Sequence, residues 1–287
     1  METRELRYFI AVAEESHVGR AAQRLGMAQP PLSRAISQLE RRIGAHLFVR
    51  SPRGMTLTTA GETLLREGRA ALAAVEAAER RTRRAIVAAG RATVVLTAKA
   101  GASSELMAKL LDAYAAEPDA VDVEVVLSPP GHQGPMLRDG RADVAILHQP
   151  FDDLSGFDAD TLCVEDQVLI VPAGHPVSRA ASLTVAESRS IPDLPPPRWP
   201  RLDGTYPDGP GPELRDLTQV LQLVRLGRAA ILMPESARVN AGEGLAVVPV
   251  SDAPPVTTVI AWPPQSVSAG VAGLVRTASR LYASPRG

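Results

Sequence analysis

A chain of 287 residues is longer than one hydrophobic core usually supports, which favours two or three domains, and with only 3% aromatic residues the cores must be built from Ala, Val, Leu and Ile. A single cysteine, Cys163, excludes a disulfide within the chain and a zinc site made of several cysteines. The net charge of −1 hides an asymmetry, since residues 1–90 hold 15 basic and 9 acidic residues (+6) and residues 91–287 hold 16 and 23 (−7), so only the first part is expected to meet a polyanion.

Two short helices are predicted at the start of the chain. Residues 3–15 repeat apolar side chains at the spacing of one helical face, and Thr3 is the expected cap. Residues 18–25 predict a second helix, which Gly26 ends in a left-handed conformation. The apolar face of the first helix is made of Leu6, Phe9, Ile10 and Ala13.

A third helix is predicted over residues 29–43, and it begins with two adjacent prolines. Pro30 and Pro31 are tolerated there because the N–H groups of a first helical turn have no partner within the helix. Apolar residues recur every three or four positions and are expected to face inward: Leu32, Ile36, Leu39 and Ile43. The opposite face carries polar and basic residues: Ser33, Arg34, Ser37, Gln38 and Arg41.

A two-stranded wing and a long helix follow. Residues 47–57 predict two strands joined by a turn at residues 51–54. Thr58 or Thr59 is expected to cap a helix that runs to about residue 88, with Glu62 completing a capping box. A narrow stripe of small and apolar residues along this helix favours pairing with a second chain over packing on its own domain. The stripe is Leu57, Gly61, Leu64, Gly68, Ala71, Val75, Ala78, Thr82 and Ala85.

Beyond residue 90 the sequence alternates strands with helices, which predicts a parallel sheet covered by helices. The predicted strands are residues 93–98, 121–127, 142–147, 164–171, 229–233, 246–250 and 256–261. The predicted helices are residues 103–116, 134–140, 216–226 and 268–281. Residues 192–212 contain eight prolines and are expected to form loops.

The stretch LRYFIAVAEESHVGRAAQRLGMAQPPLSRAISQLERRIGAHLFVRSPRGMTLTTAGETLL, residues 6–65, resembles the N-terminal domain of LysR-type transcriptional regulators. The matching features are the Ala21-Ala22 pair, the segment AQPPLSRAISQLE, the LF-R pattern at residues 47–50 and the LT-AG pattern at residues 57–61. Farther along, DGRADVAIL (residues 139–147) and LVRLGRAAILMPES (residues 223–236) resemble the effector domain of the family.

The resemblance implies an α/β protein with an all-α-plus-wing N-terminal domain. Residues 1–58 would form a winged helix-turn-helix, residues 59–90 a linker helix for dimerisation, and residues 91–287 an effector-binding domain of two α/β subdomains that resembles periplasmic binding proteins. Subdomain I would comprise residues 91–164 and 262–287, and subdomain II residues 165–261. The chain would then cross between subdomains near Glu165 and Ala261.

DNA contacts are expected from the third helix and the wing. A helix that reads the major groove needs short polar and basic side chains on its outer face, near its N-terminus. Arg34 can donate two hydrogen bonds to a guanine edge. The expected contacts are Gln29, Pro30, Ser33, Arg34, Ser37 and Gln38, with Arg50 and Arg53 from the wing. Because one such domain reads few base pairs, two paired copies are expected on a palindromic site.

A small-molecule effector is expected between the two subdomains, where strands end and helices begin. The N–H groups at the start of the helix at residues 103–116 favour an anion, and Lys99 would strengthen its binding. Together with the effectors usual in the family that the sequence resembles, this makes a small carboxylate or an aromatic acid the candidate effector. The expected contacts are Lys99, Gly101, Ala102, Ser103, Ser104, Pro130, His148, Trp199, Arg201 and Thr218. Structural roles stay open for three of them: a surface charge for Lys99, a helix cap for Ser103 and a local hydrogen bond for His148.

The expected function is sequence-specific regulation of transcription under effector control, not catalysis. The sequence has no P-loop, G-x-G-x-x-G, G-x-S-x-G or H-E-x-x-H motif, and no metal or other cofactor is expected. A solute-binding transport protein would not explain residues 1–90 and would need an export signal, which the start METRELRYF does not resemble, so a cytoplasmic location is expected. The alternative is a LysR-like regulator that binds no ligand and responds to its own concentration or to a protein partner.

The expected partners are double-stranded DNA, the effector, and further copies of the chain as a homodimer or homotetramer. RNA polymerase is a candidate protein partner. No membrane partner is expected, because no apolar run reaches membrane-spanning length.

Overall fold

The computed structural model describes residues 1–51, 54–87, 92–201, 204–214 and 217–282. The chain divides into two compact units: residues 1–82 with 138–140, and residues 83–137 with 141–287. Among the helices in the described ranges, none is both long enough and apolar enough to cross a bilayer.

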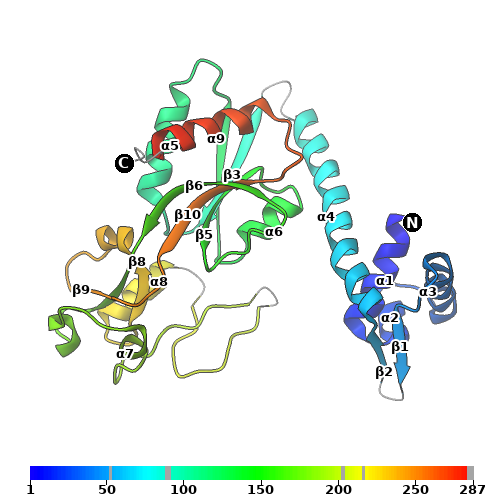
Figure 1. The fold of residues 1–287 in the computed structure, drawn as a ribbon, viewed down its shortest axis with the longest axis horizontal. Coiled ribbons are helices and arrows are strands. Elements are labelled where there is room, and N and C mark those ends of the chain that lie inside the picture. The colour runs from blue at the N-terminus through cyan, green and yellow to red at the C-terminus, as the bar shows by residue number, and fades with distance from the viewer. Residues whose placement is uncertain (52–53, 88–91, 202–203, 215–216, 283–287) are drawn as a thin grey trace. The chain divides into compact units, whose positions relative to one another are not determined.

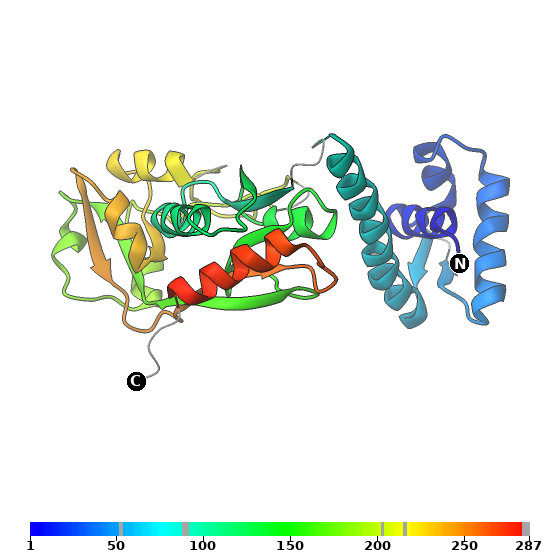
Figure 2. The ribbon, with the colours of Figure 1, turned by 90° about the horizontal axis from the view of Figure 1, so that it is seen from above.

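The first unit is a small helical domain with a wing (Figure 1). Its elements are α1 (Thr3–Glu15), α2 (Val18–Arg24), α3 (Gln29–Ile43), β1 (Phe48–Ser51), β2 (Gly54–Leu57) and α4 (Thr59–Val87). Helix α1 lies between α3 and α4 in both views (Figures 1 and 2), and side chains of the three helices meet in one core. The predicted elements of this unit are confirmed to within two residues at each end.

The cap of α1 differs from the prediction, while one of the two predicted caps of α4 is confirmed without its capping box. Thr3 does not cap α1; the N–H of Glu2 instead donates to the carboxylate of Glu5 at 2.8 Å. Helix α4 is capped by Thr58, whose Oγ1 accepts a hydrogen bond from the N–H of Gly61 at 3.0 Å. Because Gly61 then holds the third helical position and has no side chain, the predicted capping box with Glu62 does not form.

The stripe along α4 is divided between two environments. A Cβ at Gly61 would lie 2.1 Å from the carbonyl oxygen of Leu47, and one at Gly68 would lie 3.1 Å from a leucine methyl of α1. The prediction that the whole stripe faces a second chain is therefore wrong for this part, which packs on its own domain. Farther along, Val75 is 46% exposed, while the side chain of Ala85 lies outside the described part of the chain. The exposed members are Ala71, Val75, Ala78 and Thr82.

The second unit contains a larger sheet with strand order β4-β3-β5-β10-β6 and a smaller sheet with order β8-β7-β9 (Figure 1). The larger sheet is made of β3 (Thr93–Lys99), β4 (Asp122–Ser128), β5 (Val144–Gln149), β6 (Asp158–Glu165) and β10 (Val256–Trp262). The smaller sheet is made of β7 (Gln167–Pro172), β8 (Ile231–Pro234) and β9 (Leu245–Pro249).

Helices cover both sheets. Helices α5 (Ser104–Ala115) and α9 (Ala269–Tyr282) pack on one face of the larger sheet, and α6 (Gln133–Arg138) packs on the other. The smaller sheet has α8 (Leu217–Arg225) and the 3₁₀ segment η2 (Glu235–Asn240) on one face. The chain around η1 (Pro176–Arg179) and α7 (Val185–Arg189) covers its other face.

The strand directions correct the prediction of a parallel sheet. Strand β3 pairs in parallel with β4 and β5, as predicted. Strand β10 is antiparallel to both β5 and β6, and both pairs of the smaller sheet are antiparallel. The difference arises because the chain returns from the smaller sheet as a strand that enters between β5 and β6, and a return of this kind needs no helical crossover.

The crossings between the sheets also correct the prediction. The strand expected at residues 164–171 is two strands, β6 and β7, which belong to different sheets, so the first crossing falls at Asp166, next to the expected Glu165. The second crossing was expected near Ala261, but β10 already lies in the larger sheet. The chain therefore crosses back between residues 250 and 255, and the expected boundary of subdomain II at residue 261 is wrong.

Candidate functional site

Helix α3 is held firmly by its inner face. Leu32, Ile36 and Leu39 are buried against α1 and α2, as predicted. Ile43, which was also expected to face inward, is 43% exposed, because it lies in the last turn of α3, beyond the core cluster. Gly44 then ends the helix with a φ of +78°.

The outer face of α3 is open to solvent. The side chains predicted to contact DNA are exposed at Gln29, Pro30, Arg34 and Gln38 and half-buried at Ser33 and Ser37. Within the described residues, no carboxylate pairs with Arg34. An unpaired guanidinium on an open helical face is suited to a phosphate or a guanine edge.

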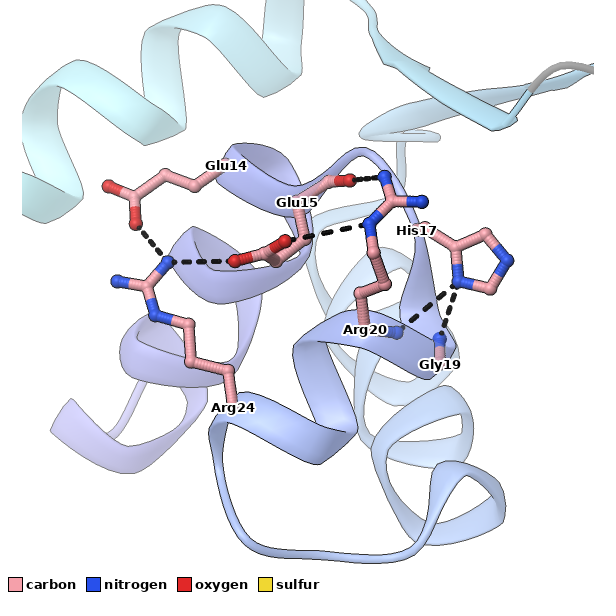
Figure 3. A network of polar contacts seen from close by, with 6 residues as sticks. All are labelled: Glu14, Glu15, His17, Gly19, Arg20 and Arg24. Carbon is pink, nitrogen blue, oxygen red and sulfur yellow. Dashed lines mark hydrogen bonds and ion pairs between the residues drawn. The ribbon is translucent and has the colours of Figure 1, made fainter.

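Other arginines of this unit are bound to neighbouring carboxylates. Arg24 Nη1 lies 2.8 Å from Glu14 Oε2 and 3.4 Å from Glu15 Oε1, and Arg20 pairs with Glu15 as well (Figure 3). The Nδ1 atom of His17 caps α2 by accepting hydrogen bonds from the N–H groups that follow it (Figure 3). This network joins α1 to α2 and fixes the turn between them, so its arginines serve the fold.

Arg42, in the last turn of α3, also serves the fold. Its guanidinium donates two hydrogen bonds to the carboxylate of Glu5, at 2.9 and 2.7 Å, and these bonds lower the pKa of Glu5 to about 2. Sequence reasoning did not identify this pair, because the two residues are 37 positions apart. Arg34 and Arg41, in contrast, are exposed on α3 with no carboxylate partner among the described residues, so they remain available to a ligand.

The wing is anchored to the end of α1. Strands β1 and β2 pair antiparallel, with Phe48 opposite Leu57. The N–H of Met55 donates to the carbonyl of Ser16 at 2.9 Å. Of the two arginines predicted to contact DNA from the wing, Arg53 lies outside the described residues, and Arg50 belongs to β1 with a side chain outside the described part.

The second unit contains a cavity of about 610 Å³ between its two sheets. One wall is the loop after β3 with the first turns of α5, and another is β8 with η2. Trp199 and Pro200, from the proline-rich segment, add apolar surface. A volume of this size fits a small organic molecule, for which pockets of roughly 300–1,000 Å³ are usual.

A polar cluster lies at the floor of this cavity. Lys99 Nζ lies 2.6 Å from Asp152 Oδ2, and their side chains are only 13% and 6% exposed. The N–H of His148 donates to the same carboxylate oxygen at 2.7 Å. His148 Nε2 and Ser103 Oγ are hydrogen-bonded to each other at 2.9 Å. Lys99, Ser103 and His148, which were predicted from the sequence, thus lie together in one cluster, and Asp152, which was not predicted, joins Lys99 to His148.

His148 is uncharged in this cluster at neutral pH. Its burial, together with the positive charge of Lys99, lowers the pKa of the imidazole to about 4, although the carboxylate of Asp152 acts in the opposite direction. Its Nδ1 atom lies 3.8 Å from that carboxylate, too far for a hydrogen bond. The cluster therefore holds one cation and one anion, joined as a pair.

The structure decides among the roles left open by the sequence. Lys99 is not a surface charge, because it is nearly buried and paired. Ser103 occupies the cap position of α5 in a left-handed conformation, with a φ of +55°, but its hydroxyl makes no capping bond and contacts His148 instead. His148 does bond its neighbours, and it also lines the cavity.

Comparison with known families agrees with this arrangement. Residues 3–62 match the family described as "Bacterial regulatory helix-turn-helix protein, lysR family", and residues 88–281 match the LysR substrate binding domain. The chain belongs to the LysR family. It is a DNA-binding transcriptional regulator with an effector-binding domain, and the resemblance and fold class predicted from the sequence are confirmed.

Individual LysR relatives extend over nearly the whole chain. The HTH-type transcriptional regulator AlsR of Bacillus subtilis is 32% identical in an alignment 253 positions long that covers 83% of this chain and 82% of AlsR. The regulator IlvR of Caulobacter vibrioides is 30% identical in an alignment 297 positions long, gaps included, that covers 99% of this chain and 100% of IlvR. The solved structure of full-length CbnR complexed with its target DNA is similar with a TM-score of 0.50 and 25% identity, covering 98% of this chain and 99% of that chain.

Eight of the ten residues predicted to contact the effector of this LysR regulator line the cavity. They are Lys99, Gly101, Ala102, Ser103, Ser104, Pro130, His148 and Trp199. Arg201 does not line it; its guanidinium instead donates to the hydroxyl of Thr205 and the carbonyl of Tyr206, within its own loop. Thr218 belongs to α8, but its side chain lies outside the described part.

Several cavity residues were missed by sequence reasoning: Asp152, Cys163, Glu165, Met233 and Ser236. Asp152 follows His148 by four positions, and an acidic residue just after a strand carrying a histidine is a usable signal. Cys163 and Glu165 end β6, which sequence reasoning did not separate from β7.

Proposed function

We propose that α3 is the helix that reads the operator of this regulator, with Arg34 as its principal base contact. The carrying observation is the unpaired guanidinium of Arg34, which lies near the start of α3 on its open face, whereas Arg42 at the other end of the helix is bound to a carboxylate. The exposed side chains of Gln29 and Gln38 and the half-buried Ser33 and Ser37 surround it on that face. The wing residues Arg50 and Arg53 complete the interface that we propose.

Arg34→Ala should weaken operator binding by about 10- to 100-fold, because a bidentate contact to guanine contributes roughly 1–3 kcal/mol of discrimination. The measurement is footprinting of the full chain on the DNA upstream of its own coding sequence. Arg189→Ala is the matched control: it removes one exposed arginine from α7, in the other unit, and should bind with the affinity of the wild type. Equal affinity of Arg34→Ala and the wild type would contradict the assignment.

Dimerisation through the exposed half of α4 is the second part of the proposal. Ala71, Val75, Ala78 and Thr82 form one face of the helix, and the small residues allow close approach of a second helix. Because Val75 is apolar and 46% exposed, its burial against a second chain would be energetically favourable. Two copies would present two α3 helices to a palindromic site, as a homodimer or as two dimers in a homotetramer.

Val75→Glu should weaken this pairing by at least about 100-fold, because the carboxylate would lie in an apolar interface without a partner. Sedimentation equilibrium would measure the change as a smaller assembly at micromolar concentration. Ala70→Glu, an exposed position on another face of α4, adds the same charge and should leave the assembly unchanged. If the two variants sediment alike, α4 does not pair through this stripe.

The cavity between the sheets is the proposed effector site. Its support is the convergence of Ser103, His148 and the N-terminus of α5 on a mostly apolar cavity. We propose that residues 1–58 bind DNA, residues 59–90 link and pair the chains, and the remaining residues bind the effector. A built cavity of this size favours ligand control over regulation by concentration or by a protein partner.

A further inference from the structure

The charges that line the effector cavity are already matched to one another. Lys99 pairs with Asp152 at its floor, at 2.6 Å. Lys109 pairs with Glu105 at its rim, at 2.7 Å, on consecutive turns of α5. Among the described residues that line the cavity, there is no arginine, and Glu165 is a further carboxylate. An incoming anion would therefore meet no unmatched cation.

Glu165 is fixed in the wall. Its Oε2 accepts a hydrogen bond from the backbone N–H of Ser236 at 2.7 Å, and the thiol of Cys163 donates to its Oε1 at 3.4 Å. The cavity lining thus carries one more negative charge than positive charges, and that charge lies on the wall formed with β6 and η2. A carboxylate ligand would be repelled by it, while a neutral N–H donor would find an acceptor.

The wall formed by α5 disfavours a cation. The first turn of α5 lines the cavity, the N–H groups of a first helical turn have no partner within the helix, and a helix N-terminus carries a partial positive charge of about half an elementary charge. This partial charge suffices to orient a carbonyl or hydroxyl oxygen. It is too small to offset the cost of desolvating a carboxylate, for which a full cation would be needed.

The remainder of the lining is mostly apolar. Leu106, Trp199, Ile231 and Met233 contribute to it, and Phe151 and Val239 are 59% and 72% exposed beside the cavity. Large apolar side chains that stay exposed around a cavity mark a surface that an apolar molecule covers.

We propose that the effector is an uncharged, mostly apolar molecule of aromatic size that carries a neutral hydrogen-bonding group such as a carboxamide, rather than the carboxylate expected from the sequence. This inference rests on the proposed function of the cavity as the effector site. The neutral state of His148 agrees with it, since the imidazole supplies no positive charge. A carboxamide has an acceptor for the N–H groups of α5 and a donor for Glu165.

Isothermal titration calorimetry of the full chain with three matched probes tests the proposal. 2-Naphthamide, 2-naphthoate and 2-naphthylmethylamine share one ring system and differ in charge at neutral pH. The amide should bind at least about tenfold more tightly than either charged probe. A tighter naphthoate or naphthylmethylamine would overturn the neutral class while leaving the cavity as the effector site. Failure of all three to bind would overturn both.

Asp152→Asn tests whether the ion pair of Lys99 with Asp152 is what disfavours a carboxylate ligand. Removal of the carboxylate frees Lys99, and the affinity for 2-naphthoate should rise at least about tenfold, since a charge-assisted hydrogen bond to the ligand becomes available. The Lys99→Met/Asp152→Asn double variant removes both charges and should keep the amide preference of the wild type. An unchanged affinity of Asp152→Asn for 2-naphthoate, in a protein whose melting temperature matches the wild type, would contradict the proposal. If Asp152→Asn does not fold, the affinities of the wild type and of the double variant for 2-naphthamide and 2-naphthoate decide whether the proposal holds.

Discussion

Gly61→Ala is expected to destabilise the first unit by about 3 kcal/mol, the upper end of the usual cost of overpacking a core. The added Cβ would lie 2.1 Å from the carbonyl oxygen of Leu47 and 2.9 Å from a methyl of Leu57. That carbonyl accepts the N–H of Thr58 at 3.0 Å, so it cannot withdraw without opening the junction of the wing with α4. The better helix propensity of Ala, worth about 1 kcal/mol, is too small to offset the overlap.

Gly68→Ala is the matched control, because it adds the same methyl group seven positions farther along α4. The new Cβ would lie 3.1 Å and 3.7 Å from the terminal methyls of Leu6 and Ile10, which can move slightly. Its stability should stay within about 1 kcal/mol of the wild type. Hydrogen exchange of peptides from residues 1–60, measured in the full chain, reports the stability of this unit. Equal protection in the two variants would show that Leu47 yields to the added methyl.

The helical unit could be predicted closely from the sequence because its signals are local. Apolar residues at helical spacing predicted α1 and α3, and Gly26 and Gly44 end helices in the left-handed conformation that glycine adopts easily. What could not be predicted was which side of α4 each part of its stripe faces. Gly61 and Val75 look alike as members of one stripe, but only the tertiary packing places the first on Leu47 and leaves the second exposed.

The second unit was harder to predict because the order and direction of its strands depend on pairing between residues far apart in the sequence. The charged dipeptide Glu165-Asp166 lies where β6 ends and β7 of the other sheet is about to begin, yet it interrupts the apolar run so briefly that the sequence predicts a single strand. Strand β6 gives little alternation, because most of its side chains are exposed. The antiparallel direction of β10 depends on where the chain returns, for which the local sequence holds no signal.

The effector cavity shows the same limit at the level of single residues. The loop after β3 and the end of β5 could be placed at the cavity, because strand ends and helix starts meet there. The partner of Lys99 could not be predicted, since Asp152 is 53 positions away and reaches it only through the turn after β5. Arg201 was expected in the cavity from its position beside Trp199, but its hydrogen bonds within the loop direct it elsewhere.

Acidification is expected to destabilise the second unit through His148. The imidazole is 5% exposed, and the Lys99 ammonium and the Asp152 carboxylate are the charged groups that face it. Burial, reinforced by Lys99, lowers its pKa from 6.5 to about 4, so between these pH values the unfolded chain binds a proton that the folded chain does not. The stability contributed by the neutral imidazole is therefore complete above pH 6.5 and is lost as the pH falls toward 4.

The size of this effect follows from the difference between the two pKa values, which corresponds to about 3 kcal/mol in total and about 2 kcal/mol between pH 7 and pH 5. Urea unfolding followed by tryptophan fluorescence measures it in the full chain, because both tryptophans, Trp199 and Trp262, belong to the second unit. His148→Asn should reduce the difference between pH 7 and pH 5 by about 2 kcal/mol. The control His46→Asn, at an exposed position of the first unit, should retain it.

A full pH dependence in His148→Asn would mean that other groups carry it. The carboxylate of Asp152 is the group to separate first, because it lies 3.8 Å from the imidazole and favours its protonation. In Asp152→Asn the imidazole loses this neighbour while Lys99 stays close, so the proton is bound even less readily in the folded state. The difference in stability between pH 7 and pH 5 should then be at least as large as in the wild type. A smaller difference would contradict the assignment of the pH dependence to His148.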